Sequence, residues 1–429
     1  MMADWLQGPY VYALYESYGF TRSDNGLLFT AGFGSSAIFG TVIGSLADRM
    51  GRRRFAALYC LLYAVSCVTK HCNSFNMLLL GRVTGGVATS LLFSVFDSWM
   101  VAEHHRRDFS PDLLGGTFSL AVFGNGIVAI LAGEVGQVAA DMKELTPVGS
   151  ETGVWFYGGY CSPFDMAILC LGISLVTMGL SWSENYGQKT ESNAGSSLGD
   201  TVATAIRTFR QHPQVLHTGI VCSLFEASMF IFVFMWTPAL TEEGQPKPPY
   251  GHIFAAFMVM SMLGSQVFSL LSDSIPLEEI GRLAIALAAL SNLVPVFATD
   301  VTVRFCSFMV FELTIGMYFP MMGTMKGLKV PEESRSAIYN LYRVPLNIIV
   351  VSSLVMKIEM STAFTLTSFM LILAIYFQSK LIGTGSASQY RHVRSTKIDT
   401  EFGLDEDDGR LASPAGKEAE MTSTIGNHQ

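Results

Sequence analysis

Eleven stretches of this sequence are apolar and long enough to cross a lipid bilayer as helices. A spanning helix needs about 20 mostly apolar residues, since the hydrocarbon core of a bilayer is about 30 Å thick. Lipid offers the backbone no hydrogen-bond partners, so such stretches form helices. The sequence therefore predicts an all-α polytopic membrane protein, with helices at 24–47, 55–70, 75–101, 113–140, 160–182, 213–240, 251–272, 281–299, 302–325, 335–356 and 360–382.

The composition agrees with this class of protein. Half of the residues are apolar and 14% are charged, whereas an average soluble domain has about 25% charged residues. The net charge of −8 comes mostly from acids in loops and in the polar C-terminal region, so nucleic-acid binding has no support. We also find no zinc-ligand spacing, phosphate-binding glycine loop or nucleophile–histidine arrangement. We therefore expect a protein that is not an enzyme and that needs no metal or cofactor.

The chain begins with a further apolar stretch, at 4–18, which is shorter than the others. A helix of that length rises about 22 Å at 1.5 Å per residue, too little to cross the bilayer. We therefore expect the first of twelve helices to be truncated, as a shortened gene or an unusual start site would make it.

The loop at 44–54 reads G-S-L-A-D-R-M-G-R-R-R. Asp48 can accept hydrogen bonds from the turn and from a helix N-terminus, and Gly51 permits a tight reversal. The arginines suit the headgroup region of the cytoplasmic leaflet. This order resembles the loop between helices 2 and 3 of the major facilitator superfamily. The resemblance implies a cytoplasmic gate built from Gly44, Asp48, Arg49, Gly51, Arg52 and Arg53.

Basic residues fall in alternate loops, which indicates the orientation of the chain. Loops rich in lysine and arginine stay on the cytoplasmic side of a membrane. We therefore expect four basic clusters to be cytoplasmic, at Arg49–Arg54, His104–Arg107, Arg207 with Arg210, and Lys326 with Lys329.

The polar stretch 183–212 separates six helices from six. A short internal repeat supports the division, because Val95-Phe96-Asp97 recurs as Val310-Phe311-Glu312. Two-bundle transporters are built from such repeats and hold substrate near the membrane midplane. The sequence thus predicts a major facilitator fold with two six-helix bundles. Its parts are an N-terminal bundle at 1–182, a cytoplasmic linker at 183–212, a C-terminal bundle at 213–383 and a disordered cytoplasmic tail at 384–429.

Charged side chains inside a bilayer are costly, so each is a candidate functional residue. The four acids of this kind lie in helices 1, 4, 7 and 10, which line the central cavity of a major facilitator fold. We expect them to line the cavity or to couple transport to protons; they are Asp4, Asp97, Glu226 and Glu312. The alternative is that buried charges pair with one another and hold the bundles together.

Two helices present polar stripes at helical spacing. In helix 4 Arg82, Gly86, Thr89, Phe93 and Asp97 recur at helical spacing and form one stripe. In helix 11, an arginine is flanked by two hydrogen-bonding residues at i−4 and i+4. A guanidinium group offers two parallel hydrogen bonds to a tetrahedral oxyanion. The predicted substrate-binding residues are Arg343, Arg82, Asn347, Tyr339 and Thr89.

Five blocks of sequence resemble the molybdate-anion transporter family of eukaryotes. They are ADWLQGPY at 3–10, LLFSVFDSW at 91–99, WSENY at 182–186, LFEASMFIFVFMWTP at 224–238 and YRVPL at 342–346. The resemblance implies uptake of molybdate by alternating access. This chain departs from the family pattern at Asp97, where the family has glutamate. It also departs upstream of Asp4, where the family chain continues. We expect a monomer in the plasma membrane, with molybdate and the lipid bilayer as its partners.

Molybdate carries two negative charges, so its entry into a negative cell is opposed by about 2.3 kcal/mol per charge and 100 mV. Coupling to protons through Glu226 or Glu312 would offset this, although uniport stays an alternative. Sulfate, which has the same charge and shape, is an alternative substrate. A membrane receptor or scaffold that has lost transport is the alternative from another class.

Overall fold

The computed structural model describes residues 1–110, 112–149, 153–187, 206–242, 244–331, 335–356 and 358–383. Residues 1–384 form one compact unit. Most of the predicted linker at 183–212 and the whole predicted tail at 384–429 lie outside the described residues. The predictions made for them therefore stay predictions.

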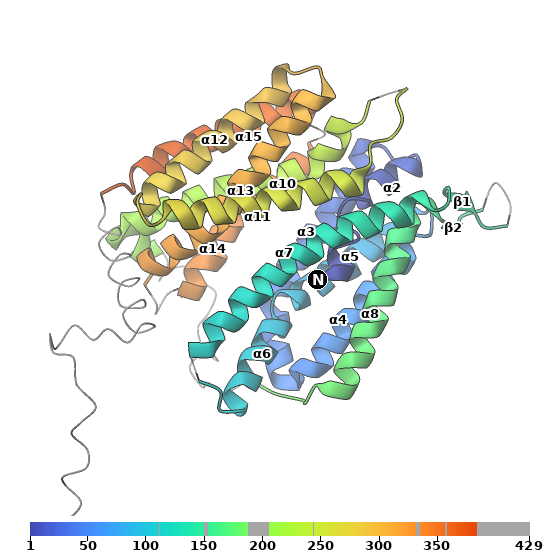
Figure 1. The fold of residues 1–429 in the computed structure, drawn as a ribbon, viewed down its shortest axis with the longest axis horizontal. Coiled ribbons are helices and arrows are strands. Elements are labelled where there is room, and N and C mark those ends of the chain that lie inside the picture. Colours follow the sequence, from blue (N-terminus) through green and yellow to red (C-terminus); the bar gives the residue numbers. More distant parts are fainter. Residues whose placement is uncertain are drawn as a thin grey trace, which may run out of the picture. The chain divides into compact units, whose positions relative to one another are not determined.

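The N-terminal half, to Ser181, contains eight α-helices and a small hairpin among its described residues (Figure 1). The helices are α1 (Met2–Trp5), α2 (Val11–Ser17), α3 (Arg22–Met50), α4 (Arg52–Thr69), α5 (Phe75–Leu92), α6 (Val95–Arg106), α7 (Asp112–Asp141) and α8 (Ser162–Ser181). Strands β1 (Thr146–Pro147) and β2 (Phe156–Tyr157) pair antiparallel between α7 and α8, before the 3-10 turn η1 (Gly159–Cys161).

The C-terminal half is formed by six long helices, which match the predicted segments closely. They are α10 (Pro213–Leu240), α11 (Tyr250–Leu271), α12 (Leu277–Phe297), α13 (Val301–Lys329), α14 (Arg335–Val355) and α15 (Met360–Ser379). Across the described part of the chain, eight helical stretches are long and apolar enough to span a membrane by themselves. The all-α polytopic prediction is therefore confirmed.

The start of the chain forms two short helices, α1 and α2, instead of one short continuous helix. A turn containing Gly8 and Pro9 separates them, since proline cannot continue a preceding helix. Both helices pack into the N-terminal half: Trp5 Nε1 donates to Asn125 Oδ1 of α7 over 2.9 Å, and Tyr10 is fully buried. Whether this helix is truncated stays a prediction.

The fourth predicted segment is broken, which corrects the expected stripe in helix 4. The chain turns at Phe93 and Ser94, so that α5 ends at Leu92 and α6 begins at Val95. Ser94 Oγ donates to the Ser90 carbonyl over 2.8 Å, a type of bond that bends helices. Arg82 and Thr89 therefore lie on α5, whereas Asp97 lies on a separate helix and is exposed.

Lys326 and Lys329 do not lie in a loop, which corrects their assignment to a cytoplasmic loop. Both belong to the last turns of α13. Lys329 Nζ lies 3.1 Å from Glu278 Oε1 of α12, and both side chains are 4% exposed. This buried ion pair joins two helices of the C-terminal half.

Substituting Lys329→Met is expected to lower the free energy of unfolding by about 3–5 kcal/mol, because the Glu278 carboxylate would stay buried without its cation. The measurement is the thermal midpoint of the purified protein in detergent. Arg282→Met is the control, since Arg282 pairs with Glu279 at 2.5 Å but is 47% exposed, and exposed pairs contribute about 0–1 kcal/mol. Equal midpoints for both variants would contradict the prediction.

The two halves meet through α7 with α11 and through α3 with α14. Gly133 of α7 and Gly251 of α11 allow close approach, because a Cβ at Gly251 would lie 2.3 Å from the Gly133 carbonyl oxygen. Gln137 reinforces this contact: its Oε1 accepts from the Gly251 backbone N–H over 2.8 Å and from the Tyr10 hydroxyl over 3.3 Å. Figure 1 shows α7 and α11 side by side near β1 and β2.

These contacts lie away from the end that carries Arg49–Arg54, which we call the basic end. Ring contacts between the N-terminal and C-terminal halves also lie away from the basic end. They are Trp5–Phe254, Tyr12–Phe234, Phe29–Phe234, Phe33–Phe230 and Tyr160–Tyr250. Within the described ranges, we find no ring contact, hydrogen bond or ion pair that joins the halves at the basic end. The halves are thus closed against each other at the opposite end.

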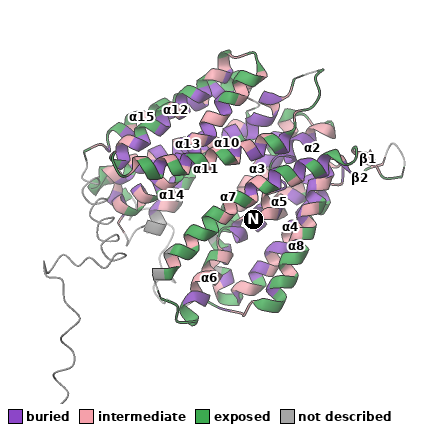
Figure 2. Cartoon of the chain, viewed as in Figure 1, coloured by how far each residue is buried: buried purple, intermediate pink, exposed green. Residues whose placement is uncertain are grey.

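Burial is concentrated on α10 and α13, in the interior of the C-terminal half (Figure 2). In its most apolar part, α10 is 67% buried and α13 61%, whereas α7 is only 17% buried. The charged residues of α10 and α13 are therefore surrounded mainly by protein.

Candidate functional site

A polar cluster connects α10 and α13 around Glu226. Its Oε1 lies 3.5 Å from Lys326 Nζ, and each side chain is about one-fifth exposed. The same oxygen accepts from Cys222 Sγ over 2.9 Å and from the Tyr318 hydroxyl over 3.4 Å. The Glu226 carboxylate thus has one cationic partner and two neutral donors. The contact between Lys326 and Glu226 is long for an ion pair. An arrangement of this kind can exchange Glu226 for another anion as the partner of Lys326.

Helix α14 brings Tyr339, one residue of its predicted polar face, to this cluster. Lys326 Nζ lies 5.7 Å from the centre of the Tyr339 ring. The helix is fixed against α10 by Tyr342, whose hydroxyl donates to the Val215 carbonyl over 2.5 Å and whose ring packs on Gly219. Arg343 follows Tyr339 by one helical turn, so the two share a face with Asn347.

Arg343 is exposed and Asn347 is intermediate in exposure. No ion pair joins Arg343 to an acid within the described ranges. An arginine in a spanning helix avoids lipid and faces water or a protein interior, because burying its charge in hydrocarbon is costly. Arg343 is therefore available to an anion, whereas Lys326 is available only when Glu226 releases it.

Glu312 lies on α13, about four helical turns before Lys326, and is 6% exposed. We find no ion pair for it among the described residues. A buried carboxyl group without a cation is far less costly in its neutral form. Its counterpart in the internal repeat, Asp97, is exposed, so the two repeat positions differ in environment.

In the N-terminal half, the predicted residues are dispersed. Arg82 Nε donates to the Leu28 carbonyl over 3.1 Å, and Thr89 bonds back to the Gly85 carbonyl of its own helix. Asp4 is held by the Tyr63 hydroxyl of α4. Within the described ranges, none of these side chains contacts the cluster on α10, α13 and α14. The structure therefore groups Glu226 and Tyr339 with Lys326, and places Arg82, Thr89, Asp97 and Asp4 elsewhere.

The motif at 44–54 organises the basic end of the N-terminal half. Asp48 Oδ1 accepts from Arg52 Nε over 2.8 Å, and Arg52 Nη1 donates to the Ser98 carbonyl of α6 over 3.0 Å. Gly51 has a φ of 113°, a conformation that favours glycine. Arg49 is exposed in the last turn of α3, and Gly44 lies further back in the same helix.

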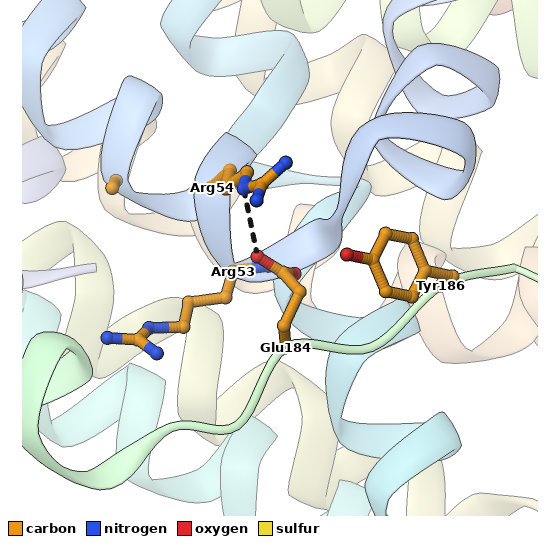
Figure 3. Close-up of a pocket in the computed structure, with 5 residues that line it drawn as sticks. Arg53, Arg54, Glu184 and Tyr186 are labelled. Carbon is orange, nitrogen blue, oxygen red and sulfur yellow. Dashed lines mark hydrogen bonds and ion pairs between the residues drawn. The ribbon is translucent and has the colours of Figure 1, made fainter.

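Glu184, beyond the end of α8, completes this arrangement. It accepts from the Arg53 backbone N–H over 2.8 Å and lies 3.7 Å from Arg54 Nε. Figure 3 shows Glu184 below Arg54, with Arg53 on one side and Tyr186 on the other. The residues line a pocket of about 430 Å³ together with Ala57. All of these contacts stay within the N-terminal half, so the role of the motif as a gate between halves stays a prediction.

The sequence analysis missed three charged residues that the structure makes prominent: Lys326, Lys70 and Glu184. The first was assigned to a loop because the apolar segment before it was predicted to end at residue 325. The second lies at the very end of its segment, where a lysine is ordinarily taken to extend to the membrane surface. The third belongs to the block WSENY, and that block was the only sequence signal for it.

Comparison with known proteins identifies relatives that match most of this chain. The profile of a family described as sugar transporters with twelve transmembrane segments matches residues 1–323. The molybdate-anion transporter of Xenopus laevis is 34% identical over 358 residues, which cover 81% of this chain and 74% of that protein. The molybdate-anion transporter of Danio rerio is 32% identical over 376 residues and covers 81% of this chain and 75% of that protein.

Solved structures agree on the fold. The nucleoside transporter NupG superposes with a TM-score of 0.65 at 12% identity and covers 89% of this chain and 96% of that one. The inward-open xylose transporter XylE from E. coli gives a TM-score of 0.65 at 14% identity, with 90% and 95% covered. At such low identity, these likenesses bear on the fold alone.

Proposed function

Because the chain belongs to the molybdate-anion transporter family of the major facilitator superfamily, we propose that it carries molybdate across a membrane by alternating access. The identity of 34% to the Xenopus laevis molybdate-anion transporter, over 81% of this chain, is the observation that carries the proposal. The test is uptake of labelled molybdate by cells that express the chain. A carrier would saturate with concentration and would require the protein at the cell surface.

The described conformation corresponds to one of the two end states of alternating access. Contacts between the halves lie at the end opposite the basic end, as expected for a carrier that is open toward the basic end. Positively charged loops favour the cytoplasm, so we assign the basic end to the cytoplasm. The conformation is then inward-facing, and we place the carrier in the plasma membrane, where cells meet external molybdate.

Arg343 and Lys326 are the cations best placed to hold molybdate in the C-terminal half. Two positive charges match the two negative charges of the anion, and the hydroxyl of Tyr339 adds a neutral donor. The Arg343 guanidinium would give two parallel hydrogen bonds to the oxyanion. Asn347 extends this face by one turn.

Glu226 makes this site responsive to protons. Its carboxylate competes with molybdate for Lys326, at 3.5 Å. When a proton neutralises Glu226, Lys326 loses its partner and gains affinity for an anion. The other titratable groups that face Glu226 are Cys222 of its own helix and Tyr318 and Lys326 of α13. Entry of one or more protons with each molybdate would offset the electrical work of moving a dianion inward.

Substituting Glu226→Gln is expected to uncouple transport from protons. The variant resembles the protonated residue, so exchange of internal for external molybdate should continue. Accumulation at equilibrium should fall by up to about 2,000-fold, since two charges at a potential of 100 mV correspond to about 4.6 kcal/mol. Wild-type uptake should rise as the external pH falls, and uptake by the variant should not.

The control for this prediction is Glu279→Gln, which alters an acid in an exposed pair with Arg282. It should keep the pH dependence of the wild type. A Glu226→Gln variant that still accumulates molybdate in proportion to the proton gradient would contradict the assignment and would direct attention to Glu312.

Sulfate is the substrate most similar to molybdate in charge and shape. A large excess of sulfate in the uptake assay distinguishes a selective molybdate carrier from a general oxyanion carrier. We further propose that the carrier works as a monomer, because one chain contains both halves. Chemical cross-linking at the cell surface, together with uptake, tests that part of the proposal.

A further inference from the structure

A second group of cations lies in the N-terminal half, at the end opposite the basic end. Lys70 follows α4 and is 1% exposed, and its Nζ has no hydrogen-bond partner within the described part of the chain. The Nζ atom lies 5.7 Å from the centre of the Tyr15 ring. Tyr15 is fully buried, and its hydroxyl also has no partner among the described residues.

Arg82 of α5 is the second cation of this group. Its guanidinium lies 4.3 Å from the centre of the Phe29 ring and packs against Gly32 of α3. Gly81, the residue before Arg82, lies beside Lys70, since a Cβ at Gly81 would be 3.0 Å from Lys70 Nζ. Neither Lys70 nor Arg82 has an ion pair with an acid within the described ranges. Two neighbouring cations therefore share a largely buried position without a compensating carboxylate.

Such an arrangement is unfavourable by itself, because a buried charge needs a partner of opposite sign. The polar groups on offer are hydrogen-bond donors: an ammonium, a guanidinium and a phenol hydroxyl. A small anion satisfies all three, and a doubly charged tetrahedral oxyanion also balances both positive charges. The arginine fork and the lysine point charge are the two side chains that suit such anions.

The position of the group indicates that it acts in the state that is open opposite the basic end. Phe29, which contacts Arg82, also contacts Phe234 of α10 across the halves, at 5.2 Å between ring centres. The group therefore lies next to the contact that closes the end opposite the basic end. When this contact opens, the group becomes accessible from that side.

We infer that Lys70, Arg82 and Tyr15 form an oxyanion site that receives molybdate when the carrier is open opposite its basic end, separate from the site at Arg343 and Lys326. The inference rests on the proposed transport of molybdate. It adds a first binding position on the entry side, from which the anion passes to the C-terminal half as the halves rock.

The experiment measures binding of labelled molybdate to purified full-length protein in detergent. The parent is the Gly251→Leu variant, in which a bulky side chain at the close contact with Gly133 holds the entry side open. Lys70→Met in this parent should weaken binding about tenfold or more, the factor expected when a charge-assisted hydrogen bond is lost. Lys70→Arg should restore much of the affinity, because it keeps the charge.

Tyr15→Phe removes one hydroxyl and no volume, so it tests the site even if Lys70→Met fails to fold. It should weaken binding about three- to tenfold. Lys143→Met is the matched control, since Lys143 also lies over a tyrosine ring, at 4.2 Å from Tyr157, but is exposed. Excess chloride and excess sulfate, in separate arms, show whether the site prefers a dianion.

Two outcomes separate this inference from the function on which it rests. Wild-type protein that neither binds nor transports molybdate would overturn the proposed function. Wild-type protein that transports molybdate, together with Lys70→Met and Tyr15→Phe variants that bind as tightly as their parent, would overturn the entry site alone.

Discussion

Arg343→Gln is expected to reduce molybdate uptake about 100-fold or more at low substrate concentration. Arg343 is exposed and lies on the same face of α14 as Tyr339, whose ring centre is 5.7 Å from Lys326 Nζ. Truncating one partner of a hydrogen-bonded charge pair costs about 2–5 kcal/mol, or roughly 30- to several-thousand-fold in affinity. The measurement is the initial rate of uptake of labelled molybdate, divided by the amount of protein at the cell surface.

Two further variants make this result specific. Arg343→Lys keeps the charge but loses the fork of parallel donors, so uptake should fall less than in Arg343→Gln. Arg282→Gln removes an exposed arginine of α12 and should leave uptake unchanged. Uptake by Arg343→Gln within about twofold of the wild type, where a full contact predicts a loss of 2 kcal/mol or more, would remove Arg343 from the anion site.

Gly251→Leu is expected to abolish net transport by preventing closure of the halves opposite the basic end. A Cβ at this position would already lie 2.3 Å from the Gly133 carbonyl oxygen and 2.4 Å from the Tyr10 hydroxyl. Overpacking of this kind costs about 1–3 kcal/mol, which shifts a two-state equilibrium roughly 5- to 150-fold toward the open form. The chain should then persist in a state open to the entry side.

Accessibility of a cysteine at position 234 reports this change. Phe234 is 4% exposed, between Tyr12 and Phe29 of the other half, so Phe234→Cys should be protected in the closed conformation. Adding Gly251→Leu should make it reactive toward an impermeant maleimide from outside. Gly172→Leu is the control, because nothing lies within 4 Å of a Cβ at Gly172. Normal uptake by Gly251→Leu, or a thiol that stays protected, would contradict the proposed conformational cycle.

The helices were predictable because the bilayer imposes one requirement on every spanning segment. From α3 to α15, apolar length alone located the long helices within a few residues, except that it joined α5 and α6 into one segment. It failed where charges lie inside a helix: the segment predicted at 302–325 ended before Lys326, although α13 continues to Lys329. Those lysines are tolerated because Glu226 and Glu278 compensate them, and such distant pairing is not visible in a local stretch of sequence.

The break between α5 and α6 had a different origin. Periodicity assumes a continuous helix, and the apolar pattern at 75–101 gives no sign of interruption. The serines at positions 90, 94 and 98 compete for backbone carbonyls in this region, which is a local effect that hydropathy ignores. As a result, the predicted alignment of Arg82 with Asp97 was wrong.

The site was predictable in its residue types but not in its grouping. Rarity of charge in apolar segments identified Glu226, Arg343 and Arg82 as functional candidates. The partner of Glu226 lies 100 residues away on another helix, so only the folded chain shows that Lys326 belongs to the same cluster. Lys70 was missed because burial at the end of a helix depends on what α2 and α5 place around it.

Uptake of labelled molybdate at nanomolar concentration, by cells that express this chain and by matched cells that do not, tests the proposed transport most directly. Surface protein is quantified in the same cells, and a large excess of sulfate is added in a parallel arm. We predict saturable uptake that depends on the chain, resists sulfate and is lost in Arg343→Gln. Equal uptake by both kinds of cells, with the protein present at the surface, would contradict molybdate transport by this chain.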